Sequence, residues 1–389
     1  MASDTNLKPA VSMPVDFRFS EVRPSPQVTG APQPPSLGPL GAFVGDFSGN
    51  GFNTIFRPDN AQTPTVLPIP VSSDNILELN LTSETLSFSP GLGSVPNRGS
   101  VQGDIFLNGV PYLQTVSDIT TGQRIGIHFE PGLWMNVPAT TDPTESDTLA
   151  RMASIPHGTT IVAQGTFTTI AGAPNIPPID ITPFIRDTTQ APPNLIRFIS
   201  QTASAQGTPR IPQDLSSFIA AGTITQAILD DPNTLLRNHI AQAKITATTT
   251  ISISTSPNTP LFGGGAENVA FLLGDAQTPP ARPNAQTFRM LATFWIETVE
   301  VTILVPIFKV GQPPLEIEAD VKAPGAPAPR FLVRPPVEIP IPRHITITFT
   351  QIQYSQMVLL DFNGLTWPHV SVATLVPSTS IGVPPGAWA

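Results

Sequence analysis

Alternation of apolar and polar residues sets the strongest limit on the fold of this chain. From Lys244 to Thr255, Ile and Ala alternate with Thr and Ser over most of the segment, and a similar alternation runs from His344 to Tyr354. Residues two apart point to the same face of a β-strand, so each segment would have one buried and one wet face. The abundance of β-branched residues favours strands as well. Both segments therefore predict β-strands.

Similar segments, separated by clusters of Pro, Gly, Asn and Asp, recur along most of the chain. The predicted strands are 41–57, 75–89, 103–117, 124–137, 148–155, 159–169, 243–255, 267–274, 287–306, 314–322, 344–362 and 369–376. About twelve strands joined by turns predict an all-β fold, which is either a barrel or a sandwich.

Three regions depart from the strand pattern. Residues 212–239 contain short amphipathic turns that predict helices. Residues 170–212 are rich in Pro and poorly patterned, and we expect a long excursion there that serves as a lid or an oligomer contact. Residues 1–36 are expected to form an extended Pro-rich arm. The predicted organisation is thus this arm followed by one β-domain over 37–389, with an insertion at about 170–240.

The composition excludes several classes of function. Only 12% of the 389 residues are charged, and 19 Lys and Arg stand against 28 Asp and Glu. A basic track that could bind nucleic acid is absent. The chain has no Cys, which excludes disulfides, thiolate metal sites and a Cys nucleophile. No apolar run reaches the roughly 18–20 residues of a membrane span, and the first residues lack a signal pattern. We therefore expect a soluble, cytoplasmic protein.

Glycines at odd positions mark the first predicted strand. Gly41, Gly45, Gly49 and Gly51 share this parity. Glycine at alternate positions lets a neighbouring strand approach closely and lets the strand coil sharply, as the first strand of a small closed barrel requires. The alternative is a Gly-rich loop before a strand. A phosphate-binding loop is excluded because no Gly-Lys-Ser/Thr follows.

Two histidines in the middle of the chain are candidates for a site. His128 and Glu130 have the same parity, so both point to one face of their strand. Such a pair is a general base, a ligand with its orienting partner, or a partly buried polar cluster. His157 lies in a Pro-His-Gly turn, either at a barrel mouth or in solvent. A metal site of two His and one carboxylate stays open on residue types alone. Catalysis by Ser, His and Asp or Glu is possible on residue types alone, although no Gly-x-Ser-x-Gly elbow is present. Enzymatic activity is therefore left open.

A third histidine begins the last predicted strand. An apolar strand ends at Asn363-Gly364, and Trp367-Pro368-His369 follows. A neutral imidazole that faces an apolar interior can bind a metal or a haem iron, whereas the alternative is a structural histidine.

Taken in order, four stretches resemble the nitrobindin-type haem-binding β-barrels, relatives of the lipocalin and fatty-acid-binding proteins. That family opens with Leu-Gly-x-Trp-x-Gly and Gly-x-Gly-x-Tyr-Pro-Thr-Ile, continues with Asp-x-x-Thr-Gly-x-x-x-x-x-Glu-x-Gly and a Pro-x-Gly turn before a strand and Gly, and ends in Pro-His-Leu-x-Ala-x-Leu. The similar stretches here run from Leu40 to Ile55, Asp118 to Gly132, Pro156 to Gly165 and Pro368 to Leu375. They cover roughly a third of the chain. Phe43 stands where the family has Trp, and Asn53 where it has Pro. The long separation between Gly165 and the last strands implies an insertion or a wider barrel.

The resemblance implies a lipocalin-like antiparallel β-barrel, enlarged, that binds a hydrophobic small molecule, with haem as the first candidate cofactor. His369 matches the family's proximal haem ligand and is the expected metal ligand. The expected apolar wall consists of Trp367, Met357, Phe43 and Phe362, with His128 or His157 near the distal side. A His-ligated iron implies gas handling or peroxidase-like chemistry.

Two other classes of function remain open at this stage. One is a carrier of a fatty or isoprenoid molecule without haem. The other is a structural or assembly protein, since a Pro-rich arm and a low charge suit subunits that pack together, which leaves a homo-oligomer open. These alternatives differ in whether the protein holds a coloured ligand, a lipid-like ligand or none.

Overall fold

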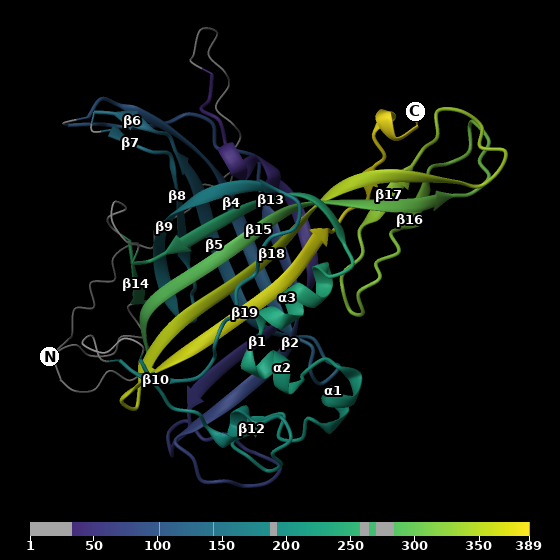
Figure 1. Cartoon of the computed structure of the whole chain (residues 1–389). Coiled ribbons are helices and arrows are strands. Elements are labelled where there is room, and N and C mark those ends of the chain that lie inside the picture. Colours follow the sequence, from purple (N-terminus) through teal and green to yellow (C-terminus); the bar gives the residue numbers. More distant parts are fainter. Residues whose placement is uncertain are drawn as a thin grey trace, which may run out of the picture.

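A closed β-barrel forms the centre of the computed structural model, which describes residues 33–100, 102–142, 144–186, 193–256, 264–269 and 284–388 (Figure 1). Ten antiparallel strands pair in a ring, and β1 closes it by pairing with both β2 and β19. In order around the barrel they are β1 (Gly45–Pro58), β2 (Asn75–Phe88), β4 (Ile105–Asp118), β5 (Ile125–Val137), β8 (Thr148–Ser154), β9 (Thr159–Ala171), β13 (Lys244–Ser254), β15 (Gln286–Val305), β18 (Arg343–Phe362) and β19 (Leu365–Pro377). Closure leaves the ring without a free strand edge. The prediction of an all-β barrel is confirmed.

The strand predictions hold to within four residues at either end of every barrel strand. The first strand begins later than expected because Gly38–Phe43 forms a 3-10 helix, η1, with a Pro in its first turn. β14 (Gly265–Asn268) lies at the start of the predicted strand 267–274, of which 270–274 fall outside the described residues. The four-residue strand β17 (Arg330–Val333) was missed, because it is too short for its alternation to stand out.

Glycine in β1 permits the closing strand pair. A Cβ atom at Gly49 would lie 2.0 Å from the backbone oxygen of Thr374, and one at Gly51 would lie 2.2 Å from that of Val372. Both oxygens belong to β19, so a side chain at either glycine would push the two strands apart. The close approach expected from the glycine spacing is therefore present where the barrel closes.

The strands β15 and β18 continue beyond the barrel into a side lobe. They pair along their whole length, from Gln286 with Asp361 to Val305 with Arg343. The lobe adds β16 (Leu315–Glu318), β17, β20 (Ile381–Gly382) and η3 (Pro385–Trp388), as the right side of Figure 1 shows. Its own apolar core is built around Phe308, Phe331 and Phe349. The remaining short strands are β3 (Val95–Asn97), β6 (Thr140–Thr141) and β7 (Thr144–Glu145).

The segment between β9 and β13 covers the outside of the barrel wall. Its elements are β10 (Phe184–Ile185), β11 (Asn194–Leu195), η2 (Ile199–Gln201), β12 (Arg210–Ile211), α1 (Ser216–Ala221), α2 (Gln226–Asp230) and α3 (Asn233–Ile240). The three helices lie within or next to the predicted region 212–239. Arg210 organises the irregular part, since its guanidinium donates hydrogen bonds to the backbone oxygens of Ser200, Thr202 and Ala205 at 2.8–2.9 Å. Apolar residues of this segment pack on the outer faces of β1, β2, β15 and β19.

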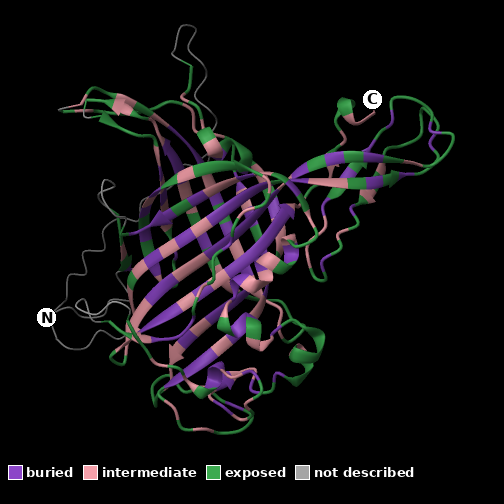
Figure 2. Ribbon diagram, viewed as in Figure 1, coloured by how far each residue is buried: buried purple, intermediate pink, exposed green. Residues whose placement is uncertain are grey.

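One half of the barrel lumen is filled with side chains. Leu40 and Phe43 of η1 enter it and pack with Phe88, Trp134 and Phe294 in the largest buried cluster. Figure 2 shows the resulting alternation of buried and less buried residues along the barrel strands. The other half, toward the end of β1 that lies away from η1, holds a cavity. The barrel is thus closed by its own core at one end and hollow at the other.

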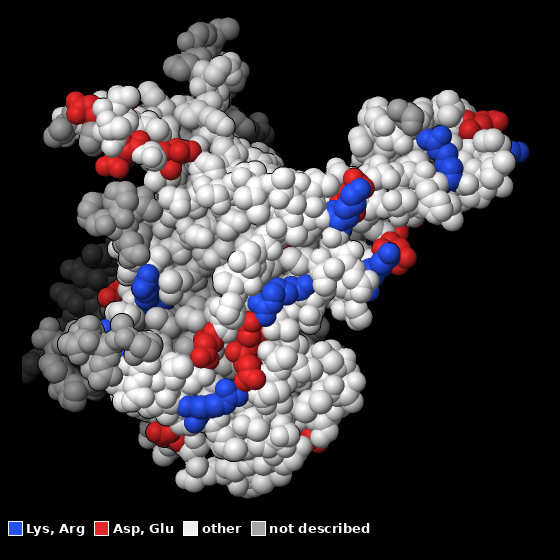
Figure 3. Space-filling model, viewed as in Figure 1, with Lys and Arg blue, Asp and Glu red and all other residues white. Residues whose placement is uncertain are grey.

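Charged side chains are sparse on the molecular face drawn in Figure 3, in keeping with the low charge content. Several of them belong to ion pairs of the outer segment, such as Arg197 with Asp230 and Arg237 with Asp231. None of the helices in the described ranges has the length and apolarity needed to cross a bilayer.

Candidate functional site

The cavity has a volume of about 490 Å³ and lies inside the barrel wall. This volume is within the usual range of roughly 300–1,000 Å³ for small-molecule sites. Its apolar lining is mainly aliphatic and comprises Ile55, Val116, Ile127, Ile155, Val358 and Leu360. Its polar lining includes Asn53, Arg57, Glu78, Gln114, His128, His157, Tyr354, Gln356, His369 and Ser371. The lining therefore suits a ligand with both apolar and polar parts.

His369 reaches the cavity from β19, where it has the parity of Ser371. Asn53 Nδ2, on the adjacent strand β1, donates hydrogen bonds to His369 Nε2 at 2.8 Å and to Ser371 Oγ at 2.7 Å. Burial, together with the nearby His128 and His157, lowers the pKa of His369 to about 4. The imidazole is therefore neutral at physiological pH, with its hydrogen on Nδ1 and its lone pair on Nε2.

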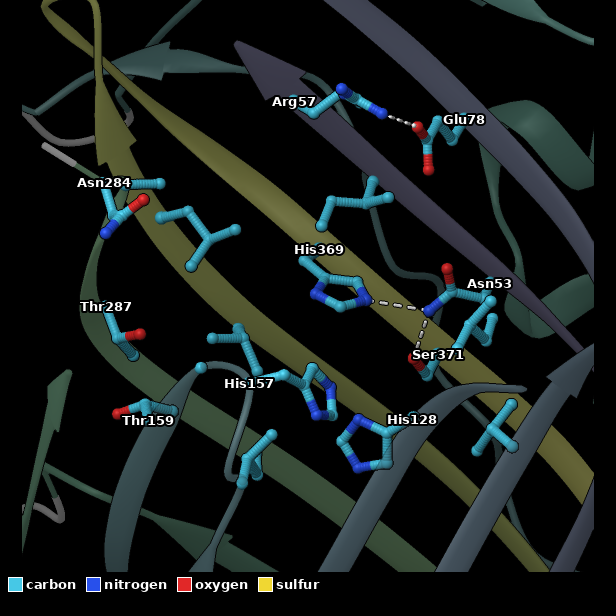
Figure 4. Close-up of a pocket in the computed structure, with 18 of the residues that line it drawn as sticks. Asn53, Arg57, Glu78, His128, His157, Thr159, Asn284, Thr287, His369 and Ser371 are labelled. Carbon is cyan, nitrogen blue, oxygen red and sulfur yellow. Dashed lines mark hydrogen bonds and ion pairs between the residues drawn. The ribbon is translucent and has the colours of Figure 1, made fainter. Parts of the chain in front are cut away.

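His128 and Glu130 act on one another as their shared parity predicts. His128 Nε2 lies 3.1 Å from Glu130 Oε2. His157 lies on the turn between β8 and β9, where it is exposed and also lines the cavity. Its ring meets that of His128 edge to face with the centroids 5.1 Å apart. Burial, reinforced by His128, lowers the pKa of His157. Figure 4 shows the three imidazoles in one cavity, with His369 turned toward Asn53 and His128 beside His157.

A buried ion pair lies beneath His128. Arg151 Nη2 of β8 donates to Glu130 Oε1 at 2.5 Å, and the Tyr112 hydroxyl donates to the same oxygen. Arg151 also donates from Nε to Tyr112 Oη and from Nη1 to Gln356 Oε1, both at 2.8 Å. Burial alone would raise the pKa of Glu130, but the charge of Arg151 and the hydrogen bonds from His128 and Tyr112 lower it to about 2. Glu130 is therefore ionised throughout the physiological range.

A second buried carboxyl group lies nearby. Tyr354 Oη donates to Glu84 Oε2 at 2.5 Å, and Gln114 Nε2 donates to Tyr354 Oη at 3.0 Å. Burial raises the pKa of Glu84, against the opposing hydrogen bonds from Tyr354 and Thr82. The two carboxyl groups next to the cavity thus have pKa values that are displaced in opposite directions.

The sequence did not point to Arg151, Tyr112, Glu84 or Tyr354. The sequence does contain an indication for Arg151. It lies two residues from Leu149 in β8, so both side chains point to the same, buried face of the strand. An ionisable residue at an apolar position of a strand needs a buried partner. The partners come from β4 and β5, so only the folded barrel identifies them.

The residues predicted for the apolar wall do not line this cavity. Trp367 packs outside it, stacked on Phe362 with ring centroids 4.6 Å apart and against Phe56 and Phe198 at 5.0 and 5.3 Å. Met357 lies on the outer face of β18, opposite in parity to Val358. Phe43 belongs to the buried cluster that fills the other half of the lumen. Trp367, Phe362 and Met357 pack on the outside because the outer segment gives β18 and β19 a second apolar face, whereas Phe43 of η1 fills the other half of the lumen.

The histidines do not form a metal centre by themselves. Within the described residues, no cluster of three or more His, Cys, Asp or Glu side chains is arranged to hold a metal ion. The two-His-one-carboxylate combination of His128, Glu130 and His157 is brought together, but Glu130 is already bound by Arg151 and Tyr112.

Comparisons with known proteins do not assign a family. No family model matches the chain, and no curated protein matches it by sequence. A solved structure titled "Crystal Structure of Rv2717c from M. tuberculosis" aligns with a TM-score of 0.32 and 9% sequence identity, covering 89% of this chain and 98% of that one. The function therefore has to be inferred from the cavity itself.

Proposed function

We propose that the barrel binds haem in this cavity, with His369 as the iron ligand. The observation that carries the proposal is the state of this imidazole: it is neutral, it is turned to a cavity of suitable size, and its lone pair is on Nε2. Neutral imidazole is the form that coordinates iron. The resemblance of the last strand to the nitrobindin pattern supports the same residue.

The donor set fits haem on one condition. Coordination through Nε2 has to replace the hydrogen bond from Asn53, whose amide keeps a second acceptor in Ser371. The Asn53 amide selects the tautomer that ligation needs, since it donates to Nε2 and leaves the hydrogen on Nδ1. The aliphatic residues of the cavity supply apolar contacts for a macrocycle. Arg57, whose side chain is 39% exposed and ion-paired with Glu78, would have to share its charge with carboxylate groups at the mouth.

The remaining residues of the cavity orient and shield the bound group. Ile55 and Leu360 lie on β1 and β18, the two strands that pair with β19. Val116 and Ile127 line the cavity from β4 and β5. A His-ligated iron with an open sixth position binds diatomic gases and peroxides, which is the chemistry such a cofactor would supply. The polar groups that line the cavity, among them His128 and Gln356, would contact a molecule bound there.

The proposal is tested by titrating the purified protein with hemin and following the absorption spectrum. We expect one equivalent to bind with a Soret band typical of histidine ligation, and we expect His369→Ala to lose that band. His344→Ala is the matched control, because His344 is exposed on β18, outside the cavity. An unchanged band in His369→Ala would contradict the proposal.

A protein without any Soret band would support a carrier of another small molecule. The lining argues against a long alkyl chain, since three imidazoles and the Arg57–Glu78 pair share the cavity. Extraction of the purified protein with organic solvent, followed by mass spectrometry, identifies such a ligand.

A further inference from the structure

His128 has a feature that haem binding at His369 does not explain. Its ring is held by a buried carboxylate at one nitrogen and faces the cavity with the rest of its edge. The carboxylate already has a counter-ion, because Arg151 and Glu130 form a one-to-one ion pair. His128 is therefore not needed to neutralise Glu130.

The charge on Glu130 determines which nitrogen of His128 carries the hydrogen. Glu130 Oε1 accepts hydrogen bonds from Arg151 and Tyr112, and Oε2 faces His128 Nε2 at 3.1 Å. An ionised carboxylate can only accept, so Nε2 must donate. A neutral imidazole has one N–H hydrogen, so in the neutral form of His128 the lone pair would be on Nδ1.

The groups around His128 leave this lone pair in place. His157, on the β8–β9 turn, has a lowered pKa and meets His128 edge to face, and His369 on β19 is neutral as well. Tyr354 of β18 donates its hydrogen to Glu84 of β2. Glu84 and Glu130 both act on His128 electrostatically, and Glu130 is paired with Arg151. A carboxylate that fixes the tautomer of a histidine and stabilises its protonated form is the arrangement that makes histidine an effective base.

We propose that His128 is the proton acceptor of the cavity, an inference that rests on the proposed function because the iron at His369 would bind the anion that remains. A small acid H–A that binds there transfers its proton to Nδ1 of His128. The H–A bond breaks, its electron pair stays on A, and an N–H bond forms. The imidazolium produced is stabilised by Glu130 through Nε2–H. The substrate class is a weak acid that binds as its anion, such as a hydroperoxide or hydrogen cyanide.

The first test uses the protein without haem. In [15N]histidine-labelled protein, NMR of the ring nitrogens distinguishes the two neutral tautomers. We expect the neutral form of His128 to be the Nε2–H tautomer, and we expect a loss of this preference in Glu130→Gln. Finding the hydrogen of His128 on Nδ1 would overturn the inference whether or not haem binds.

The second test uses the ferric, hemin-loaded protein with hydrogen cyanide as the probe, since it binds as an anion and must lose a proton. His128→Gln keeps an amide N–H for Glu130 but provides no basic nitrogen. We expect this variant to slow cyanide association by about a hundredfold or more. Carbon monoxide, which carries no proton, is the control for the ferrous protein, and its association should change by less than about threefold.

The two tests separate the possible failures. Equal slowing of cyanide and carbon monoxide would show that His128 acts only on access or packing, and would overturn the inference. Failure of the protein to bind hemin would contradict the proposed function, while the tautomer measurement would still decide the state of His128.

Discussion

Asn53 Nδ2 lies 2.8 Å from Nε2 of His369, and this contact joins the first and last strands of the barrel. The two residues face the cavity from β1 and β19. Asn53 is paired in register with Ser371, which lies two residues from His369. The position of the imidazole is thus set by barrel closure and by an amide that selects its tautomer. The same amide occupies the lone pair that an iron would use.

Asn53→Ala is expected to bind hemin about fivefold more tightly than the wild type. Coordination at Nε2 replaces a hydrogen bond whose net contribution is about 1 kcal/mol, and the variant no longer has to break it. Hemin titration under equal conditions measures the difference. Asn80→Ala serves as the control, because Asn80 donates to Asn53 and has no hydrogen bond to His369. Weaker binding in Asn53→Ala would show that the amide holds the ligand histidine in place and does not compete with iron.

Acid should release the iron from His369 only at low pH. Burial lowers the pKa of this residue to about 4, so its imidazole stays neutral down to that pH, and coordination competes further with the proton. We expect the Soret band to persist at pH 5 and to be lost near pH 4 or below. Tryptophan fluorescence on the same samples separates this loss from unfolding. A midpoint near 6.5, the ordinary value for histidine, would place the imidazole in water.

Arg151→Met should destabilise the fold by about 3–5 kcal/mol. The variant leaves the carboxylate of Glu130 buried without its counter-ion, which is the costly way to break a buried ion pair. The double variant Arg151→Met/Glu130→Gln removes the charge as well, and we expect it to regain at least about 1 kcal/mol. Urea unfolding of the three proteins measures both values. A double variant no more stable than Arg151→Met would show that charge burial is not the main cost.

Glu297 should make the stability depend on pH. It is buried on the outer face of β15, where burial raises its pKa to about 8 against a hydrogen bond from Gln351. The folded state therefore keeps a proton that the unfolded state loses above its ordinary pKa of about 4.5. This contribution to stability is complete below pH 4.5 and is lost as the pH rises to about 8.

The test compares the wild type with Glu297→Gln. At pH 7 the loss amounts to about 3 kcal/mol in the wild type. The variant cannot ionise, so its free energy of unfolding should fall less between pH 5 and pH 8. Parallel pH profiles of the two proteins would contradict the assignment. Because the comparison uses slopes, any constant effect of the new amide cancels.

Much of the fold follows from local pattern. The alternation in two segments and the clusters of Pro, Gly, Asn and Asp between the others place every barrel strand, and the glycine parity anticipates the close approach of β19 to Gly49 and Gly51. Both signals are properties of neighbouring residues and of backbone sterics. The pairing order of the strands and the side lobe depend on contacts between distant segments, which the alternation does not encode.

The candidate site was only partly predictable for the same reason. Parity correctly joined His128 to Glu130, and the turn at His157 lies beside them. Parity could not tell the lumen from the outer face, because the described residues between β9 and β13 bury the outside of the wall as well. The apolar side chains of Trp367 and Met357 pack against that outer layer and not in the lumen. The contacts of Arg151 and Tyr112 with Glu130 could not be predicted, because they depend on the pairing of β5 with β4 and β8.

The most direct test of the account is the spectrum of the His369→Gly variant loaded with hemin, recorded without and with added imidazole. The account predicts that the variant loses the histidine-ligated Soret band and that free imidazole restores it by entering the space left by the side chain. A variant whose spectrum matches the wild type before any imidazole is added would contradict the account, because iron would then have a ligand other than His369.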